Sequence, residues 1–137
     1  MNPSTRPAAN VLVLWVIWFA LVSSIVFYQF VLGHGILTGS DAQPASHNPI
    51  ALFAAGQIVV ASLLRWLLLP KVRVYHRQLI VMVIGLTLSE SVELYGIFLF
   101  GSDMPSTKMT LFAASLLSAI QFVPIFAKQN NADGQNG

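Results

Sequence analysis

The hydrophobic residues of this chain fall into four long runs, each interrupted by only a few polar positions. The runs are Val11–Leu32, Pro49–Leu69, Gln78–Phe100 and Lys108–Phe126. A helix rises about 1.5 Å per residue, so about 20 apolar residues cross the roughly 30 Å hydrocarbon core of a bilayer. The pattern therefore predicts an all-α membrane protein, a bundle of four transmembrane helices.

The polar segments between the runs are short and leave no room for a separate soluble domain. We expect residues 1–128 to form a single four-helix transmembrane domain. The apolar stretch of the first run is about 22 residues long, more than the 7–15 of a signal-peptide core, so we interpret it as a membrane anchor. The last segment, 129–137, is polar and rich in Asn and Gly, which predicts a disordered tail.

Composition narrows the class of protein further. Of the 137 residues, 55% are hydrophobic and only 9% are charged, whereas soluble domains carry roughly a quarter charged residues. Seven Lys and Arg against five Asp and Glu is too small an excess for a nucleic-acid surface. The sequence has no Cys, which excludes disulfides, thiol catalysis and thiolate metal sites within the chain.

The cationic residues indicate how the chain is oriented. If it crosses the membrane four times, one end of the bundle carries Arg6, Lys71, Arg73, Arg77 and Lys128. Lys108 lies at the other end, and Arg65 is one turn inside the first boundary, from which its long side chain can reach back. The positive-inside rule then places both termini in the cytoplasm, and we expect a bacterial-type plasma membrane. The cluster Lys71, Arg73 and Arg77 is also expected to contact anionic lipid headgroups.

Two local similarities raise the question of an internal repeat. Ser24–Tyr28 resembles Ser91–Tyr95, and Leu52–Gly56 resembles Leu111–Ser115. The spacing differs only in the outer loops, which absorb insertions at little cost. Two interpretations remain open, namely two tandem hairpins that arose by duplication and a coincidence among apolar residues.

Two acidic residues, Glu90 and Glu93, lie near the middle of the third run. Carboxyl groups at this depth are costly, usually face a bundle interior or a water-filled cavity, and mark functional sites. The two residues are three apart and therefore neighbours on one helix surface. Two close carboxylates in a low dielectric do not both ionise, so we expect at least one to be protonated at neutral pH. The alternative is a protonated carboxyl that only bonds to another helix and specifies packing.

Polar side chains of the other runs lie at a similar depth, counted from the outer end of each run. They are Gln57 and four serines, Ser23, Ser24, Ser115 and Ser118. Oxygen ligands of this kind suit protons or hard cations such as Na⁺. We therefore expect an ion site at Glu90 and Glu93 supported by this polar layer, with H⁺ or Na⁺ as the ion and with no other cofactor or metal site.

The segment Ser89–Gly96 resembles the ion-carrying helix of subunit c, the rotor-ring proteolipid of rotary ATP synthases. Sodium-type members of that family pair a Glu-Ser dipeptide with a Tyr five residues after the Glu and with a Gln on the preceding helix. Glu90, Ser91, Tyr95 and Gln57 stand at the matching positions. The resemblance implies that Glu90 is the ion-carrying carboxylate, that Ser91 and Gln57 are ligands, and that Tyr95 locks the Glu. It covers only the region from Gln57 to Gly96, and the first and fourth runs have no counterpart in it.

Two hypotheses for function follow. In the first, the chain binds or relays H⁺ or Na⁺ within the membrane, as a homo-oligomer or as a subunit of a transport or ion-motive complex. In the second, it is a non-transporting accessory or scaffold protein whose buried carboxyls only specify helix packing. The sequence contains no phosphate-binding loop, nucleophile elbow or metalloprotease helix. An enzymatic function is therefore the least favoured, and the lipid bilayer is the first expected partner.

Overall fold

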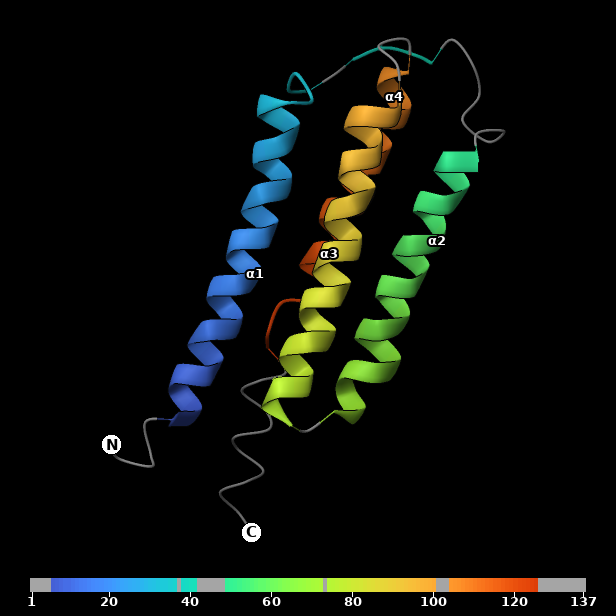
Figure 1. Ribbon diagram of the computed structural model, residues 1–137. Coiled ribbons are helices and arrows are strands. Elements are labelled where there is room, and N and C mark those ends of the chain that lie inside the picture. The colour runs from blue at the N-terminus through green and yellow to red at the C-terminus, as the bar shows by residue number, and fades with distance from the viewer. Residues whose placement is uncertain (1–5, 37, 42–48, 73, 101–103, 126–137) are drawn as a thin grey trace.

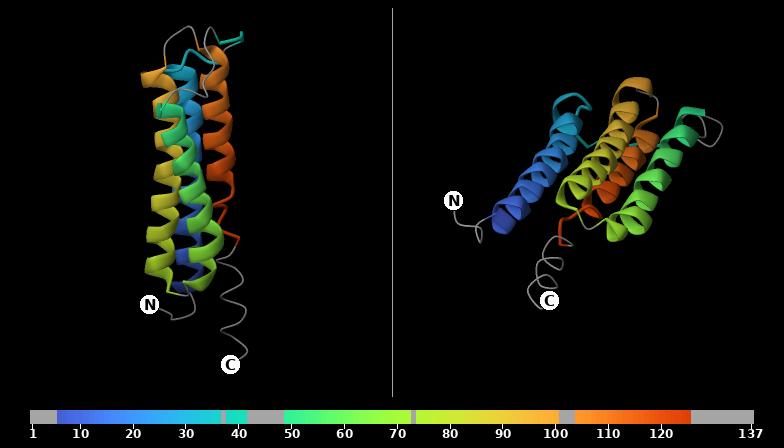
Figure 2. Two further views of the ribbon diagram at one scale, coloured as in Figure 1. Left: turned by 90° about the vertical axis from the view of Figure 1, so that its right-hand side faces the viewer. Right: turned by 60° about the horizontal axis from the view of Figure 1, so that its bottom comes forward.

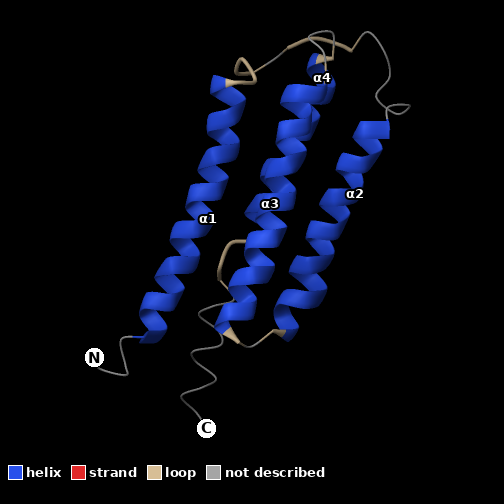
Figure 3. Ribbon diagram, viewed as in Figure 1, coloured by secondary structure: helices blue, strands red, loops and turns tan. Residues whose placement is uncertain are grey.

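The computed structural model describes residues 6–36, 38–41, 49–72, 74–100 and 104–125. Its four α-helices run side by side (Figure 1): α1 (Arg6–Val31), α2 (Pro49–Leu63), α3 (Tyr75–Leu99) and α4 (Pro105–Ile120). After Leu63, α2 continues as a π-helical turn, Leu64–Leu68, and a 3-10 turn, Leu69–Lys71. Helices and loops account for the whole of the described chain (Figure 3). The predicted all-α class is confirmed.

Helix α3 occupies the centre of the bundle. It packs against each of the other three helices, and α4 lies behind it in the view of Figure 1. Helices α1 and α2 lie on opposite sides of α3, as the right-hand view of Figure 2 also shows, and each of them contacts α4 as well. In the described part of the chain, the contact between α1 and α2 is marginal at most. The side chains of α3 therefore decide how the three outer helices are held.

Three helical segments are long and apolar enough to cross a membrane. They are Asn10–Val31, Pro49–Lys71 and Tyr75–Leu99, with mean hydropathies of 2.5, 1.9 and 1.6. Their outward faces carry large exposed apolar side chains, Phe19 and Phe53 among them. A water-soluble surface does not present apolar side chains so extensively, whereas a lipid-facing surface does. The chain is thus a multi-pass helical membrane protein in contact with the bilayer.

The fourth predicted run, Lys108–Phe126, remains helical only as far as Ile120. Helix α4 has 16 residues and is about 24 Å long, less than the roughly 30 Å of a hydrocarbon core. The local reason is Pro124, which lacks an N–H for the helical ladder and whose ring clashes with the carbonyl four residues earlier. Proline also disfavours helical geometry at the residue before it, Val123. The chain therefore leaves the helix before it has crossed the bilayer.

A close contact between α3 and the segment after α4 holds this turn in place. Phe122 is completely buried, in a cluster that includes Met82, Leu86 and Ala119. Its ring lies so close to Gly85 that a Cβ atom built there would be 2.1 Å from Cζ. Only a residue without a side chain allows this approach, so Gly85 is the position on α3 that receives the turn.

Candidate functional site

Three consecutive residues of α3, Ser89, Glu90 and Ser91, each form a hydrogen bond to a different neighbouring helix. Successive residues of an α-helix are rotated by about 100°, so adjacent side chains necessarily point in different directions. Ser89 faces α4, Glu90 faces α1 and Ser91 faces α2. The segment therefore fixes the rotation of α3 within the bundle.

The hydrogen bonds from this segment to α4 involve three buried serines. Ser89 Oγ donates to Ser118 Oγ at 2.8 Å and also lies 3.0 Å from the carbonyl oxygen of Gly85. Ser115 Oγ donates to the Ser89 carbonyl oxygen at 2.7 Å. The small side chains let the two helices approach closely, as is typical of helix interfaces in membranes. Ser115 and Ser118, both predicted to support the site, thus pack against α3.

The hydrogen bond from this segment to α1 involves the carboxyl of Glu90. Ser24 Oγ lies 2.6 Å from Glu90 Oε1, and it also lies 2.8 Å from the carbonyl oxygen of Leu21. Glu90 is half-buried, whereas Ser23, the preceding residue of α1, is exposed. Of the two serines predicted on this helix, Ser24 is therefore the one that meets a glutamate.

The contact with α2 brings together three of the predicted site residues. Ser91 Oγ donates to Gln57 Oε1 at 2.9 Å, and Gln57 Nε2 donates to the Tyr95 hydroxyl at 3.3 Å. All three side chains are half-buried. Gln57 thus has a partner for both ends of its amide, and Glu90, which bonds to α1, lies on a different side of α3.

Glu93 lies one turn beyond Glu90 and has a different environment. Its side chain is 1% exposed, and neither carboxyl oxygen has a hydrogen-bond partner in the described part of the chain. A buried carboxylate without a donor is very costly, and such a group is normally held in its neutral form. Among the described residues there is also no group of three His, Asp or Glu that could hold a metal ion. Glu93 is therefore a buried carboxyl without a hydrogen-bond partner among the described residues.

The end of α4 is held by polar groups from other helices, which the sequence pattern did not indicate. Trp18 Nε1 of α1 donates to the carbonyl oxygen of Ala119 at 3.1 Å. Arg65 Nε donates to the carbonyl oxygen of Gln121. The sequence predicted only that the Arg65 side chain reaches back to the membrane boundary. Both acceptors lie at the end of α4, where a helix leaves carbonyl groups without an intrahelical partner. The Ala119 carbonyl also accepts the backbone N–H of Phe122 at 3.1 Å. Arg65 lies in the π-helical turn Leu64–Leu68.

The side chain of Gln121 adds a second connection between α2 and α4. Its Oε1 accepts a bond from Trp66 Nε1 at 3.2 Å, and its Nε2 donates to Ser62 Oγ at 3.1 Å. The guanidinium carbon of Arg65 lies 5.3 Å from the centre of the Trp66 ring, within the range of a cation–π contact. Together these contacts stabilise the turn that ends α4.

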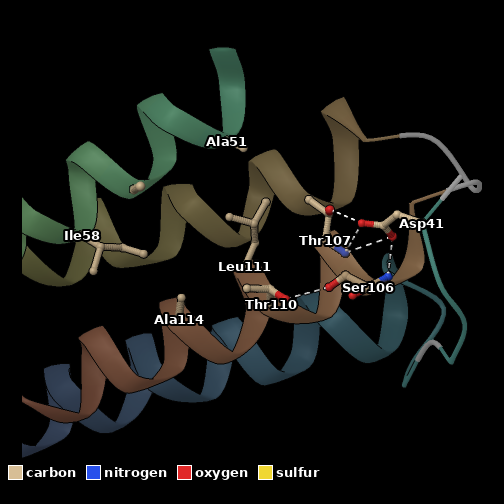
Figure 4. A pocket seen from close by; sticks show the side chains of 9 residues that line it. Asp41, Ala51, Ile58, Ser106, Thr107, Thr110, Leu111 and Ala114 are labelled. Atoms are coloured by element: carbon tan, nitrogen blue, oxygen red, sulfur yellow. Dashed lines mark hydrogen bonds between the residues drawn. The ribbon is translucent and has the colours of Figure 1, made fainter. Parts of the chain in front are cut away.

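The other end of α4 is capped by Asp41, from the segment between α1 and α2. Its Oδ1 accepts the backbone N–H of Ser106 at 2.8 Å, and its Oδ2 accepts the N–H of Thr107 at 3.0 Å and the Thr107 hydroxyl (Figure 4). The bond from the Thr107 hydroxyl, followed by the backbone bonds, lowers the pKa of Asp41 below its usual value. Asp41 thus supplies an ionised carboxylate from a distant part of the chain to the first turn of α4, where a negative charge is favourable.

The predicted cationic cluster is described in part. Lys71 and Arg77 are exposed near the connection between α2 and α3, at the end of the bundle where α1 begins (Figure 1). Arg73 and Lys128 lie outside the described residues, as does the predicted tail 129–137.

Comparison with known proteins finds no matching family model, no matching curated protein and no matching solved structure. Fold and site together define a class, that of multi-pass helical membrane proteins with a carboxyl buried among the helices. The functional assignment depends on the geometry of this chain.

Proposed function

We propose that this protein takes up and releases a proton within the membrane at Glu93, as part of a transport or ion-motive complex. The observation that carries the proposal is the burial of a carboxyl whose two oxygens have no hydrogen-bond partner among the described residues. A carboxyl retained only for packing is expected to bond to another helix. Ionisable groups buried in membrane helices mark proton and ion pathways.

The arrangement of the other oxygens favours a proton over Na⁺. A hard cation requires several oxygen ligands that converge on one point. The side chains of Glu90, Ser91 and Ser89 diverge toward three different helices, and each of them bonds there. The resemblance of this region to the rotor-ring proteolipid favours a carboxyl-based mechanism but points to Glu90. We assign the ion-exchanging role to Glu93 instead, because Glu93 is the carboxyl without a hydrogen-bond partner among the described residues.

Labelling with a hydrophobic carbodiimide, which reacts with protonated carboxyls in apolar surroundings, tests this assignment. We expect Glu93 to be modified in the purified protein, and more slowly as the pH rises because the reactive form is the neutral one. Glu90→Gln should leave the labelling unchanged, whereas Glu93→Gln should abolish it. Modification of Glu90 alone, or a rate that does not depend on pH, would contradict a proton-exchanging Glu93.

A second candidate function is that of a non-transporting scaffold. The observation in its favour is that Ser89, Glu90 and Ser91 hold one neighbouring helix each, which is a packing role. Proteoliposomes that contain a pH-sensitive dye separate the two functions. A proton flux that is retained in Glu90→Gln and lost in Glu93→Gln supports proton transfer. If Glu93→Gln changes neither the labelling nor the flux and only alters thermal stability, the scaffold is favoured.

We further propose that both termini lie in the cytoplasm and that the chain crosses the membrane four times. Support comes from the exposed Lys71 and Arg77, which lie at the end of the bundle where α1 begins and which we assign to anionic lipid headgroups. Reporter fusions after Lys128 and at Ser40 test the topology. We expect the first in the cytoplasm and the second outside, and an external carboxyl terminus would refute the four-crossing arrangement.

A further inference from the structure

A pocket of about 350 Å³ lies between α2 and α4, at the end of the bundle where Asp41 caps α4 (Figure 4). This volume falls in the range of about 300–1,000 Å³ that is typical of small-molecule sites. Its floor is apolar and is formed by Ala51, Ala55 and Ile58 of α2 with Leu111 and Ala114 of α4. The three alanines leave the space open between the two helices.

The mouth of the pocket is polar and carries a negative charge. Asp41 lines it, and both oxygens of this carboxylate accept bonds from the first turn of α4. No cationic side chain of the described residues is paired with Asp41. Thr110, one turn further along α4, donates its hydroxyl hydrogen to the Ser106 carbonyl at 2.8 Å, so its oxygen remains able to accept. The mouth thus offers acceptors and a negative charge.

We propose that this pocket binds an amphiphile with an ammonium headgroup, such as an ethanolamine phospholipid. The ammonium group would lie between Asp41 and Thr110, and the acyl chain would follow the floor toward Ile58. Charge complementarity supports this ligand, because the carboxylate attracts a cation and repels an anionic headgroup. Depth supports it as well, since the polar mouth lies at one end of the bundle and the apolar floor extends toward its middle (Figure 4).

Native mass spectrometry of the protein in an uncharged maltoside detergent tests the proposal. The probes are phosphatidylethanolamine and phosphatidylglycerol with identical acyl chains, which differ in the headgroup alone. We expect one saturable equivalent of phosphatidylethanolamine, bound about fivefold more tightly than phosphatidylglycerol, as is reasonable for a partly exposed charge pair. Asp41→Asn keeps an oxygen that can cap α4 but removes the charge, so it should abolish this preference.

A bulky substitution in the pocket tests whether the lipid binds there. Ala55→Phe would fill the pocket and should abolish saturable binding of the ethanolamine lipid. Ala20→Phe adds the same ring to an exposed position of α1, away from the pocket, and should bind like the wild type. Equal affinity of the wild type for both lipids, or unchanged binding in Ala55→Phe, would overturn the proposal, as would tighter binding of phosphatidylglycerol.

Discussion

The substitution Gly85→Ala tests the contact between α3 and Phe122, which holds the segment after α4. In Gly85→Ala the new Cβ atom would lie 2.1 Å from Cζ of Phe122 and 2.4 Å from Cε1, whereas ordinary contacts begin near 3.4 Å. Because Phe122 is fully buried, its ring can move only against packed neighbours. Overpacking lowers the free energy of unfolding by about 1–3 kcal/mol. Alanine in place of a helical glycine raises it by about 1 kcal/mol. We expect a net loss of about 1 kcal/mol in the free energy of unfolding, at most about 2.

Gly56→Ala is the matched control, because a Cβ atom at Gly56 meets nothing within 4 Å. It should be neutral or up to about 1 kcal/mol stabilising. The assay is unfolding in mixed micelles, followed by circular dichroism as a denaturing detergent is added. Phe122→Leu removes the tip of the ring, so Gly85→Ala should cost less in that background, by about 0.5–3 kcal/mol of coupling. If Gly85→Ala is as stable as Gly56→Ala, or if the two substitutions are additive, the described contact is wrong.

Two further predictions concern the two ends of α4. The bond from Thr107 lowers the pKa of Asp41, so the stability that this carboxylate contributes is complete above its unfolded pKa and is lost as the pH falls through the lower folded pKa. Thermal unfolding between about pH 6 and 2 should show this acid-dependent loss in the wild type and not in Asp41→Asn. At the other end, Trp18→Phe removes the donor to the Ala119 carbonyl and should cost about 0.6–1.7 kcal/mol in the micelle assay. Trp15→Phe should cost less, since the Trp15 indole has no hydrogen-bond partner in the described part of the chain, and equal losses would argue against the Trp18 bond.

The hydrophobic runs were sufficient to predict the helical class and the positions of α1, α2 and α3. They did not predict where α4 ends. Pro124 was visible in the sequence, but a helix end at this depth also requires donors for its carbonyl groups. These donors, Trp18 and Arg65, lie 101 and 56 residues away from their acceptors and come from other helices. Local periodicity carries no information about such partners.

The sequence predicted the level along the helices at which the polar residues lie, but not which face of α3 each of them contacts. Counting residues placed Ser24, Gln57, Ser115 and Ser118 at the level of the glutamates, and all four do contact α3 at this level. Which face of α3 each of them meets depends on where the neighbouring helices stand, and that is a tertiary property. The lack of a hydrogen-bond partner for Glu93 is likewise a property of the assembled bundle.

The central position of α3 has a consequence for the order in which the bundle assembles. Helices α1 and α2 precede α3 in the chain, and they find their packing partners only when α3 and α4 have followed. If the helices insert in the order of the chain, α1 and α2 would reside in the bilayer as separate helices until α3 arrives. Their mean hydropathies, 2.5 and 1.9, exceed the 1.6 of the α3 span. In that order, the helix that carries both glutamates would enter the membrane after two of its packing partners, which could then shield its polar groups from lipid.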